Sequence, residues 1–131
     1  MQCMDPSEVD ARRNSQMLKG VLDLCILALL SDGPLYGYAV VDALAGRGLD
    51  LVAEGTIYPL LTRMEKAGTV DSFKAPSPEG PPRKYYQLTE AGERELAAGV
   101  DQWHRLNGQV GALFGSVAGG SVDEAVDRAA R

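Results

Sequence analysis

The sequence is poor in the side chains that most metal centres and nucleophilic enzymes use. Its 131 residues contain one histidine, His104, and two cysteines, Cys3 and Cys25. These residues lack the spacing of metal ligands, and the sequence has no glycine-rich phosphate-binding or dinucleotide-binding loop. A Ser-His-Asp triad would have to use His104, which falls on a long helix without a candidate pocket. We therefore expect no enzyme, no cofactor and no metal site, and interpret His104 as a surface side chain.

Long apolar runs and secretion signals are also missing. The most apolar stretch, residues 21–30, is interrupted by Asp23 and has about half of the roughly 20 residues that a membrane-spanning helix needs. The N-terminus lacks a basic segment followed by an apolar core, so no signal peptide is expected. Cys3 lies in a polar segment and Cys25 in an apolar helical pattern, which predicts two reduced thiols and a cytoplasmic protein.

Positive charge is not in excess either. The chain has 13 Lys and Arg against 18 Asp and Glu, which gives a formal net charge of −5. This excludes a uniformly basic coat for nucleic acid, although it allows one basic face. With 45% apolar residues, the chain can build one domain with a core but is too short for two large domains.

Turn residues and apolar spacing divide the chain into an arm, four helices and a hairpin. Residues 1–14 are polar and are interpreted as a flexible N-terminal arm. The expected helices span residues 15–30, 34–45, 54–66 and 90–115. Two strands, 69–74 and 83–88, are joined by a loop rich in proline and glycine, which predicts a hairpin with a long, stiff tip. The tail, residues 116–131, is expected to be a short helix or disordered.

Each expected helix has an apolar face that predicts the core. The inward residues of the second helix are Tyr38, Val41, Leu44 and Ala45. Those of the third helix are Ile57, Leu60, Leu61, Met64 and Ala67. Gly37 is interpreted as allowing close packing, and Tyr38 as filling the core rather than forming a functional pair with Tyr36. Tyr85 and Tyr86 alternate across a strand, so one ring should face the core and the other solvent or DNA.

This order of elements is that of a winged helix-turn-helix domain, residues 15–89, with an added C-terminal helix. The predicted fold class is mainly α with a small β-hairpin. In such domains the third helix enters the major groove, and the hairpin, called the wing, contacts the DNA backbone or the minor groove. Winged helices also serve as protein-interaction modules, so the order leaves both functions open.

The outward face of the third helix suits DNA. It is rich in hydroxyls and cations and short of acids: Thr56, Tyr58, Pro59, Thr62, Arg63 and Lys66. Arg63 has the donor geometry to bind a guanine edge or a phosphate, and the hydroxyls can donate hydrogen bonds to phosphates. The alternative interpretation is an ordinary solvated helix face.

Most basic residues lie on the elements that a winged helix turns toward DNA. Those in the arm, at the start of the first helix, in the third helix or in the wing are Arg12, Arg13, Lys19, Arg63, Lys66, Lys74, Arg83 and Lys84. Residues 15–90 nevertheless carry 7 cations and 9 anions, a net charge of −2. Binding would therefore depend on local placement and should weaken steeply with salt.

Three segments carry a pattern that is specific in combination. They read LALLSDGPLYGY at residues 27–38, GTIYPLLTRMEKAG at 55–68 and RKYYQLTEAG at 83–92. Over about residues 18–96, the chain resembles the PadR family of bacterial transcriptional regulators. Ala53 departs from the better helix cap common in the family. The short C-terminal region resembles the small subgroup with a single dimerisation helix.

The resemblance implies a homodimeric winged-helix repressor that binds double-stranded DNA at an inverted repeat near its own or a neighbouring promoter. It implies that Thr56, Tyr58, Pro59 and Arg63 lie on the recognition helix. It also assigns Arg83 and Lys84 to the wing. With Lys19 of the first helix and Lys66 of the third helix added, the predicted DNA-binding residues are Lys19, Thr56, Tyr58, Pro59, Arg63, Lys66, Arg83 and Lys84.

The resemblance also implies dimerisation through the C-terminal helix. The predicted dimerisation residues are Leu96, Val100, Trp103, Val110 and Leu113. Trp103, the only tryptophan, is interpreted as an anchor of that interface. A second interpretation makes Trp103, with Val100, a stacking platform for a planar aromatic effector between two protomers, as in small PadR-like proteins that bind planar drugs.

Two alternatives of other classes stay open from the sequence. One is a winged-helix module whose third helix binds another protein, which the net charge of −5 favours. The other is a small-molecule sensor without direct DNA readout, which rests on Trp103 alone.

Overall fold

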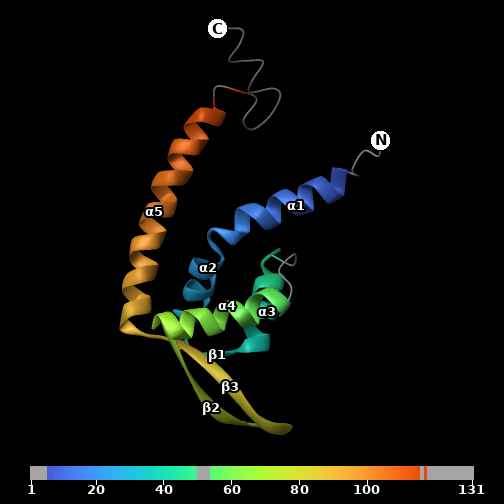
Figure 1. The fold of residues 1–131 in the computed structure, drawn as a ribbon, viewed down its shortest axis with the longest axis vertical. Helices are drawn as coiled ribbons and strands as arrows, with labels where there is room; N and C mark the ends of the chain where they lie inside the picture. Colours follow the sequence, from blue (N-terminus) through green and yellow to red (C-terminus); the bar gives the residue numbers. More distant parts are fainter. Residues whose placement is uncertain (1–5, 50–53, 116, 118–131) are drawn as a thin grey trace. The chain divides into compact units, whose positions relative to one another are not determined.

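The computed structural model describes residues 6–49, 54–115 and 117, and the chain divides into two compact units at the Leu96–Ala97 junction. The elements are α1 (Pro6–Lys19), α2 (Leu22–Leu30), β1 (Leu35–Tyr36), α3 (Gly37–Gly46), α4 (Glu54–Ala67), β2 (Val70–Ser77), β3 (Gly80–Leu88) and α5 (Glu90–Phe114) (Figure 1). The fold is mainly helical with one small antiparallel sheet, which confirms the predicted fold class. None of the described helices is long and apolar enough to cross a membrane.

The N-terminal helices differ from their prediction. Residues 6–14, interpreted as a flexible arm, belong to α1, and the helix predicted over 15–30 is divided at Gly20 and Val21. The backbone N–H of Val21 donates to the carbonyl of Leu18 at 3.0 Å, a tighter turn than the α-helical one. The apolar spacing behind the prediction starts only at Leu18, so it could not detect the polar part of α1.

The sheet contains a strand that the sequence did not predict. A helix was expected to begin at Pro34, but Leu35 and Tyr36 form β1 and pair antiparallel with Tyr86 and Tyr85 of β3. The strand order is β1-β3-β2. A strand of two residues is too short to show a periodicity. It is defined only by its pairing with a partner strand about 50 residues away in the sequence.

The hairpin of β2 and β3, the wing, has longer strands and a shorter turn than expected. Only Pro78 and Glu79 separate the strands, so the predicted long loop tip is wrong. The other three prolines of the tip, Pro76, Pro81 and Pro82, lie within the strands. Proline cannot donate to the ladder and is tolerated at edges and bulges. The pairing register accordingly shifts between Ala75 and Ser77, around Pro76.

The core of the first unit lies where α2, α3 and α4 pack on the sheet. Its buried side chains are Leu22, Ile26, Leu27, Leu30, Val40, Leu44, Ile57, Leu61, Met64, Val70 and Tyr86. The predicted inward face of α4 is confirmed at Ile57, Leu61 and Met64, while Leu60 is half-buried and Ala67 is exposed.

In α3 the predicted core face is partly wrong. Tyr38 is 53% exposed and Ala45 is exposed, whereas Val40 and Leu44 fill the core and Val41 is half-buried. The inward stripe is formed by Val40 and Leu44, while Tyr38 lines a hollow beside Tyr58. The alternation of Tyr85 and Tyr86 is confirmed, since Tyr86 is buried and Tyr85 packs on the other face of the sheet.

Local contacts at two helix starts agree with the sequence. Thr89 caps α5, because its Oγ1 accepts a hydrogen bond from the backbone N–H of Gly92 at 3.0 Å. The same hydroxyl donates to the carbonyl of Gly68 at 2.6 Å, which ties the start of α5 to the end of α4. Gly37 allows close packing as expected: a Cβ there would lie 2.5 Å from Cε1 of Tyr58.

Candidate nucleic-acid interface

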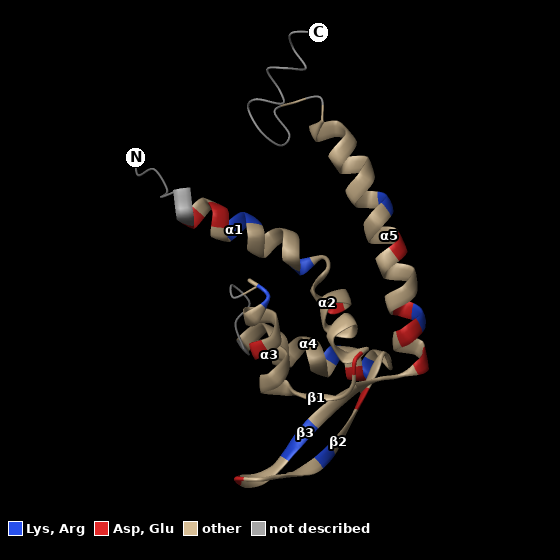
Figure 2. Cartoon of the chain, turned by 180° about the vertical axis from the view of Figure 1, so that it is seen from behind, with Lys and Arg blue, Asp and Glu red and all other residues tan. Residues whose placement is uncertain are grey.

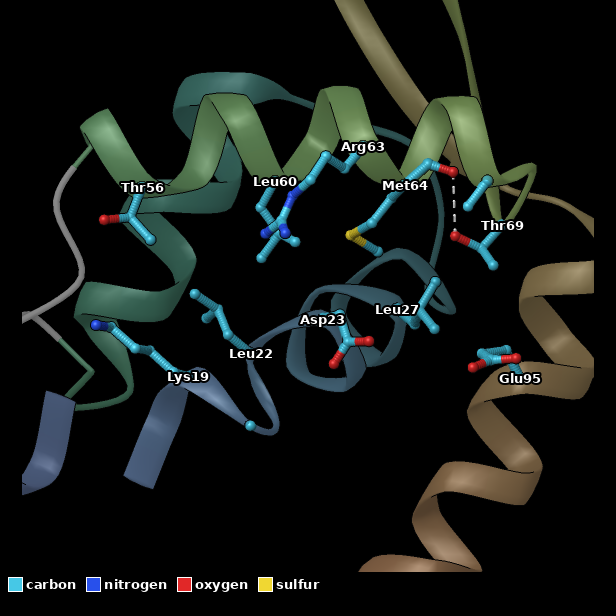
Figure 3. A pocket seen from close by; sticks show the side chains of 12 residues that line it. Lys19, Leu22, Asp23, Leu27, Thr56, Leu60, Arg63, Met64, Thr69 and Glu95 are labelled. Atoms are coloured by element: carbon cyan, nitrogen blue, oxygen red, sulfur yellow. Dashed lines mark hydrogen bonds between the residues drawn. The ribbon is translucent and has the colours of Figure 1, made fainter. Parts of the chain in front are cut away.

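Two of the predicted DNA-binding residues of α4 lie beside a hollow rather than on its outermost face. Thr56 and Arg63 line a hollow of about 400 Å³ between α4 and the α1–α2 junction, together with Lys19. Figure 3 shows the Arg63 side chain extending over Leu60 toward α2. The structure therefore brings Lys19 of α1 next to the α4 residues, which the sequence alone could not show.

This hollow has mixed charge. Asp23 of α2 and Glu95 of α5 also line it, opposite the cations of Lys19 and Arg63 (Figure 3). Within the described part of the chain, neither Lys19 nor Arg63 forms an ion pair. Both cations thus keep their charge available to an outside anion such as a phosphate.

The most outward stripe of α4 carries Pro59 and Lys66, which are both exposed. Thr62 shares this region, but its hydroxyl donates to the carbonyl of Tyr58 at 3.1 Å and is engaged within the helix. Tyr58 lies toward the wing: it lines a second hollow, of about 320 Å³, with Tyr38, Arg83 and other residues. The predicted face of α4 is therefore divided between two neighbouring surfaces.

The wing flank of α4 holds a charged residue that the sequence analysis missed. Both carboxylate oxygens of Glu65 are bonded: Oε2 accepts from the Ser72 hydroxyl at 2.5 Å and Oε1 from Lys84 Nζ at 3.2 Å. The hydrogen bond from Ser72, followed by that from Lys84, holds the pKa of Glu65 below its usual range. No local pattern could have linked Glu65 to Lys84, because the two lie 19 residues apart.

The two predicted wing cations lie on opposite faces of β3. Lys84 faces α4, where the bond to Glu65 raises its pKa and its Nζ lies 5.3 Å from the centre of the Tyr86 ring. Arg83 faces the other side, with its guanidinium 4.4 Å from the centre of the Tyr36 ring. Figure 2 shows basic residues along the middle of the wing and an acidic residue at its tip, where the turn holds Glu79.

An aromatic row continues from Arg83 across the outer face of the sheet. Tyr36 meets Tyr85 edge to face at 5.7 Å between ring centres, and Tyr85 stacks on Phe73 at 5.6 Å. These contacts stiffen the base of the wing, because aromatic pairs on neighbouring strands stabilise a sheet. Arg83 therefore lies against a ring, and no acid among the described residues forms an ion pair with it.

The arrangement is that of a winged helix. Helices α2, α3 and α4 pack together, β1 pairs with the hairpin, and α4, the third of these helices, lies beside the cationic wing. Residues 26–98 match the sequence model of the transcriptional regulator PadR-like family.

The chain belongs to the PadR-like family.

Solved structures of PadR-like proteins are similar along most of their length. A PadR-like transcriptional regulator from Bacillus cereus is 40% identical, with a TM-score of 0.70, and the match covers 76% of this chain and 96% of that one. A PadR family transcriptional regulator from Eggerthella lenta is 34% identical, with a TM-score of 0.74, over 82% of this chain and 94% of that one. These matches place the chain among transcriptional regulators rather than enzymes.

A third similar structure contains DNA. It is Bacillus subtilis PadR in complex with operator DNA, which is 27% identical, with a TM-score of 0.57. The match covers 61% of this chain and 45% of that protein. The family match itself begins in α2 and ends in α5, so it spans the winged-helix region.

The part of α5 in the second unit has an exposed apolar stripe. Its predicted dimerisation residues Val100 and Trp103 are exposed, Trp103 by 43%, and Val110 is half-buried. Leu113 and Phe114 extend the stripe, and Phe114 is 58% exposed. Leu96, in the first unit, instead packs against the core. His104 is exposed, as expected, and the predicted tail beyond residue 117 lies outside the described residues.

Proposed function

We propose that this chain is a homodimeric repressor that binds an inverted repeat in a promoter and acts in the cytoplasm. The observation that carries the proposal is the surface formed by the end of α1, α4 and the wing, where Lys19, Arg63 and Arg83 lie without an acidic partner among the described residues. The similarity to a PadR protein solved in complex with operator DNA supports DNA as the ligand. A domain with net negative charge can bind DNA in this way, because cations near phosphates dominate over distant anions.

In this proposal α4 is the recognition helix. It enters the major groove with Pro59 and Lys66 foremost, while Thr56 and Tyr58 on its two flanks donate to phosphates. Arg63 reaches either a guanine edge or a phosphate by swinging out of the hollow that it lines. Lys19 on one side and Arg83 on the other supply contacts to the backbone that are sensitive to salt, and Lys84 adds another when it is released from Glu65.

The proposed dimer forms through α5. Its 25 residues include Gly92, Gly99, Gly108 and Gly111, each of which weakens a helix by about 1 kcal/mol relative to alanine. A helix of this composition with Trp103 and Phe114 exposed gains stability when a second copy covers the apolar stripe. A two-fold dimer also presents two copies of α4 to the two halves of an inverted repeat.

We further propose that a planar aromatic effector stacks on Trp103 beside Val100 and releases the DNA. The indole is exposed, and Gly99 and Gly108 lie on the same helix within one and a half turns of it, which leaves room for a flat ligand between two protomers. The test is a panel of planar aromatic compounds followed by the emission of Trp103 and by DNA affinity. If neither quantity changes with any compound, Trp103 is an interface anchor only.

The experiment that tests the main proposal is fluorescence anisotropy of a labelled upstream promoter fragment titrated with the protein. A scrambled fragment of equal length is the control, and both are measured at two salt concentrations. We expect tight binding to the promoter alone, with affinity falling as salt rises. Equal binding to both fragments, or binding to neither, would instead favour the interaction-module function, and a partner protein should then be sought.

A further inference from the structure

An acidic side chain lies where the proposed function needs cations. Glu65 is on α4, the proposed recognition helix, and a carboxylate near phosphates weakens DNA binding. Its position is explained by its bonds: both oxygens are used, one by Ser72 of β2 and one by Lys84 of β3. Three elements, the recognition helix and both strands of the wing, therefore meet at one carboxylate.

The wing needs such a connection because of its own charges. Lys74 and Lys84 are directly opposite each other in the register of β2 and β3, so two like charges share one face of the hairpin. The Glu65 carboxylate lies 3.2 Å from Lys84 Nζ and offsets this repulsion. The adjacent ring of Tyr86, which is buried in the core, holds the same ammonium group from the other side.

We infer that Glu65 is a positioning residue for DNA binding: by holding Ser72 and Lys84, its carboxylate fixes the wing against α4. The angle between wing and recognition helix then matches the two surfaces of DNA that these elements contact. The inference rests on the proposed function. It also assigns Lys84 to Glu65 in the free protein, which leaves Arg83 and Lys74 as wing cations without an ion pair among the described residues.

The test is Glu65→Gln, which keeps an oxygen to accept from Ser72 and removes the charge that holds Lys84. If Glu65 positions the wing, the ratio of promoter affinity to scrambled-DNA affinity should fall by up to roughly fivefold, the most that an exposed ion pair contributes to an equilibrium. At the same time the salt slope should become steeper, because Lys84 is released to contact phosphates. If Glu65 acts only as a repelling charge, affinity for both DNAs should rise equally and the ratio should not change, which overturns the inference.

A matched control variant and a rescue variant make the result specific. Glu79→Gln removes the same charge from the wing turn, where Glu79 forms no ion pair with any described residue. We expect it to leave the affinity ratio unchanged. The double variant Glu65→Lys with Lys84→Glu restores an ion pair of reversed sign and should recover most of the ratio that each single variant loses. A double variant no better than either single one would contradict the inference.

A measurement without DNA separates this inference from the proposed function. Hydrogen exchange of the wing amides, residues 70–77 and 80–88, should be faster in Glu65→Gln than in Glu79→Gln at unchanged helical content. If the unaltered protein does not prefer its promoter, the proposed function fails while this comparison still decides whether Glu65 holds the wing. Equal exchange in the two variants would overturn the inference whatever the DNA result.

Discussion

The contact between the start of α5 and the turn that follows α4 allows a quantitative prediction about Gly92. A Cβ built on Gly92 would overlap the backbone carbonyl oxygen of Thr69 and lie 2.8 Å from Cδ1 of Leu88. The carbonyl cannot rotate away as a side chain would, and it also accepts the backbone N–H of Thr89 at 3.2 Å. We therefore expect Gly92→Ala to push the first turn of α5 away from the end of α4.

The size of the effect follows from three contributions. Overpacking in a well-packed core costs about 1–3 kcal/mol, and a rigid backbone atom places this case near the upper end. Loss of the Thr89–Thr69 hydrogen bond adds about 1 kcal/mol. The better helix propensity of alanine returns about 1 kcal/mol. The free energy of unfolding should therefore fall by about 3 kcal/mol, which lowers Tm by roughly 10 °C for a chain of this size.

The assay is urea unfolding followed by circular dichroism at one fixed protein concentration, because association would make stability depend on concentration. Gly46→Ala is the matched control: Gly46 is helical in α3, and a Cβ there would have no heavy atom within 4 Å. We expect that variant to be as stable as the unaltered protein or slightly more stable. If Gly92→Ala unfolds at the same urea concentration as Gly46→Ala, the contact with Thr69 does not constrain the start of α5 and the reasoning is wrong.

Four further predictions concern binding, pH and association. Arg63→Ala should weaken promoter binding by about 1–3 kcal/mol if the side chain reads a base, whereas an equal loss on scrambled DNA in the same titration would mark a phosphate contact. Arg83→Ala should lower the salt slope of binding by about one, and an unchanged slope would show that Arg83 does not contact a phosphate. The pKa of Glu65 is lowered in the folded chain, so its contribution to stability should be complete above the usual Glu pKa and lost as pH falls through the lowered value. The free energy of unfolding, measured across this acidic range, should therefore depend less on pH in Glu65→Gln than in the unaltered protein. Trp103→Ala should shift sedimentation toward the monomer, and an unchanged dimer would remove Trp103 from the proposed interface.

Much of the chain was predictable because its signals are local. The stripe of Ile57, Leu61 and Met64 repeats with the helical period, so the sequence placed α4 and its buried face correctly. Thr89 is a strong cap for the helix that follows it, and its hydroxyl does accept the N–H of Gly92. The family pattern in residues 27–92 then identified the arrangement of these elements as a PadR-like winged helix.

Other features depended on partners that are distant in the sequence. Tyr38 was expected in the core and is exposed, because the packing of α3 turns Val40 and Leu44 inward and leaves Tyr38 beside Tyr58 of α4. The prolines near the wing turn indicated a loop, yet Pro81 and Pro82 lie in a strand at the end of the hairpin, where missing N–H groups are tolerated.

Local sequence patterns were enough to predict the fold class, the family and the elements that present basic residues, because helical periodicity, caps and turns are set by neighbouring residues. Which side chains meet became visible only in the folded chain. Folding placed Lys19 beside Thr56 and Arg63, and it brought Glu65 within 3.2 Å of Lys84. The physical reason is that such contacts follow from strand register and helix packing, which close the chain over tens of residues and leave no periodic trace in the sequence.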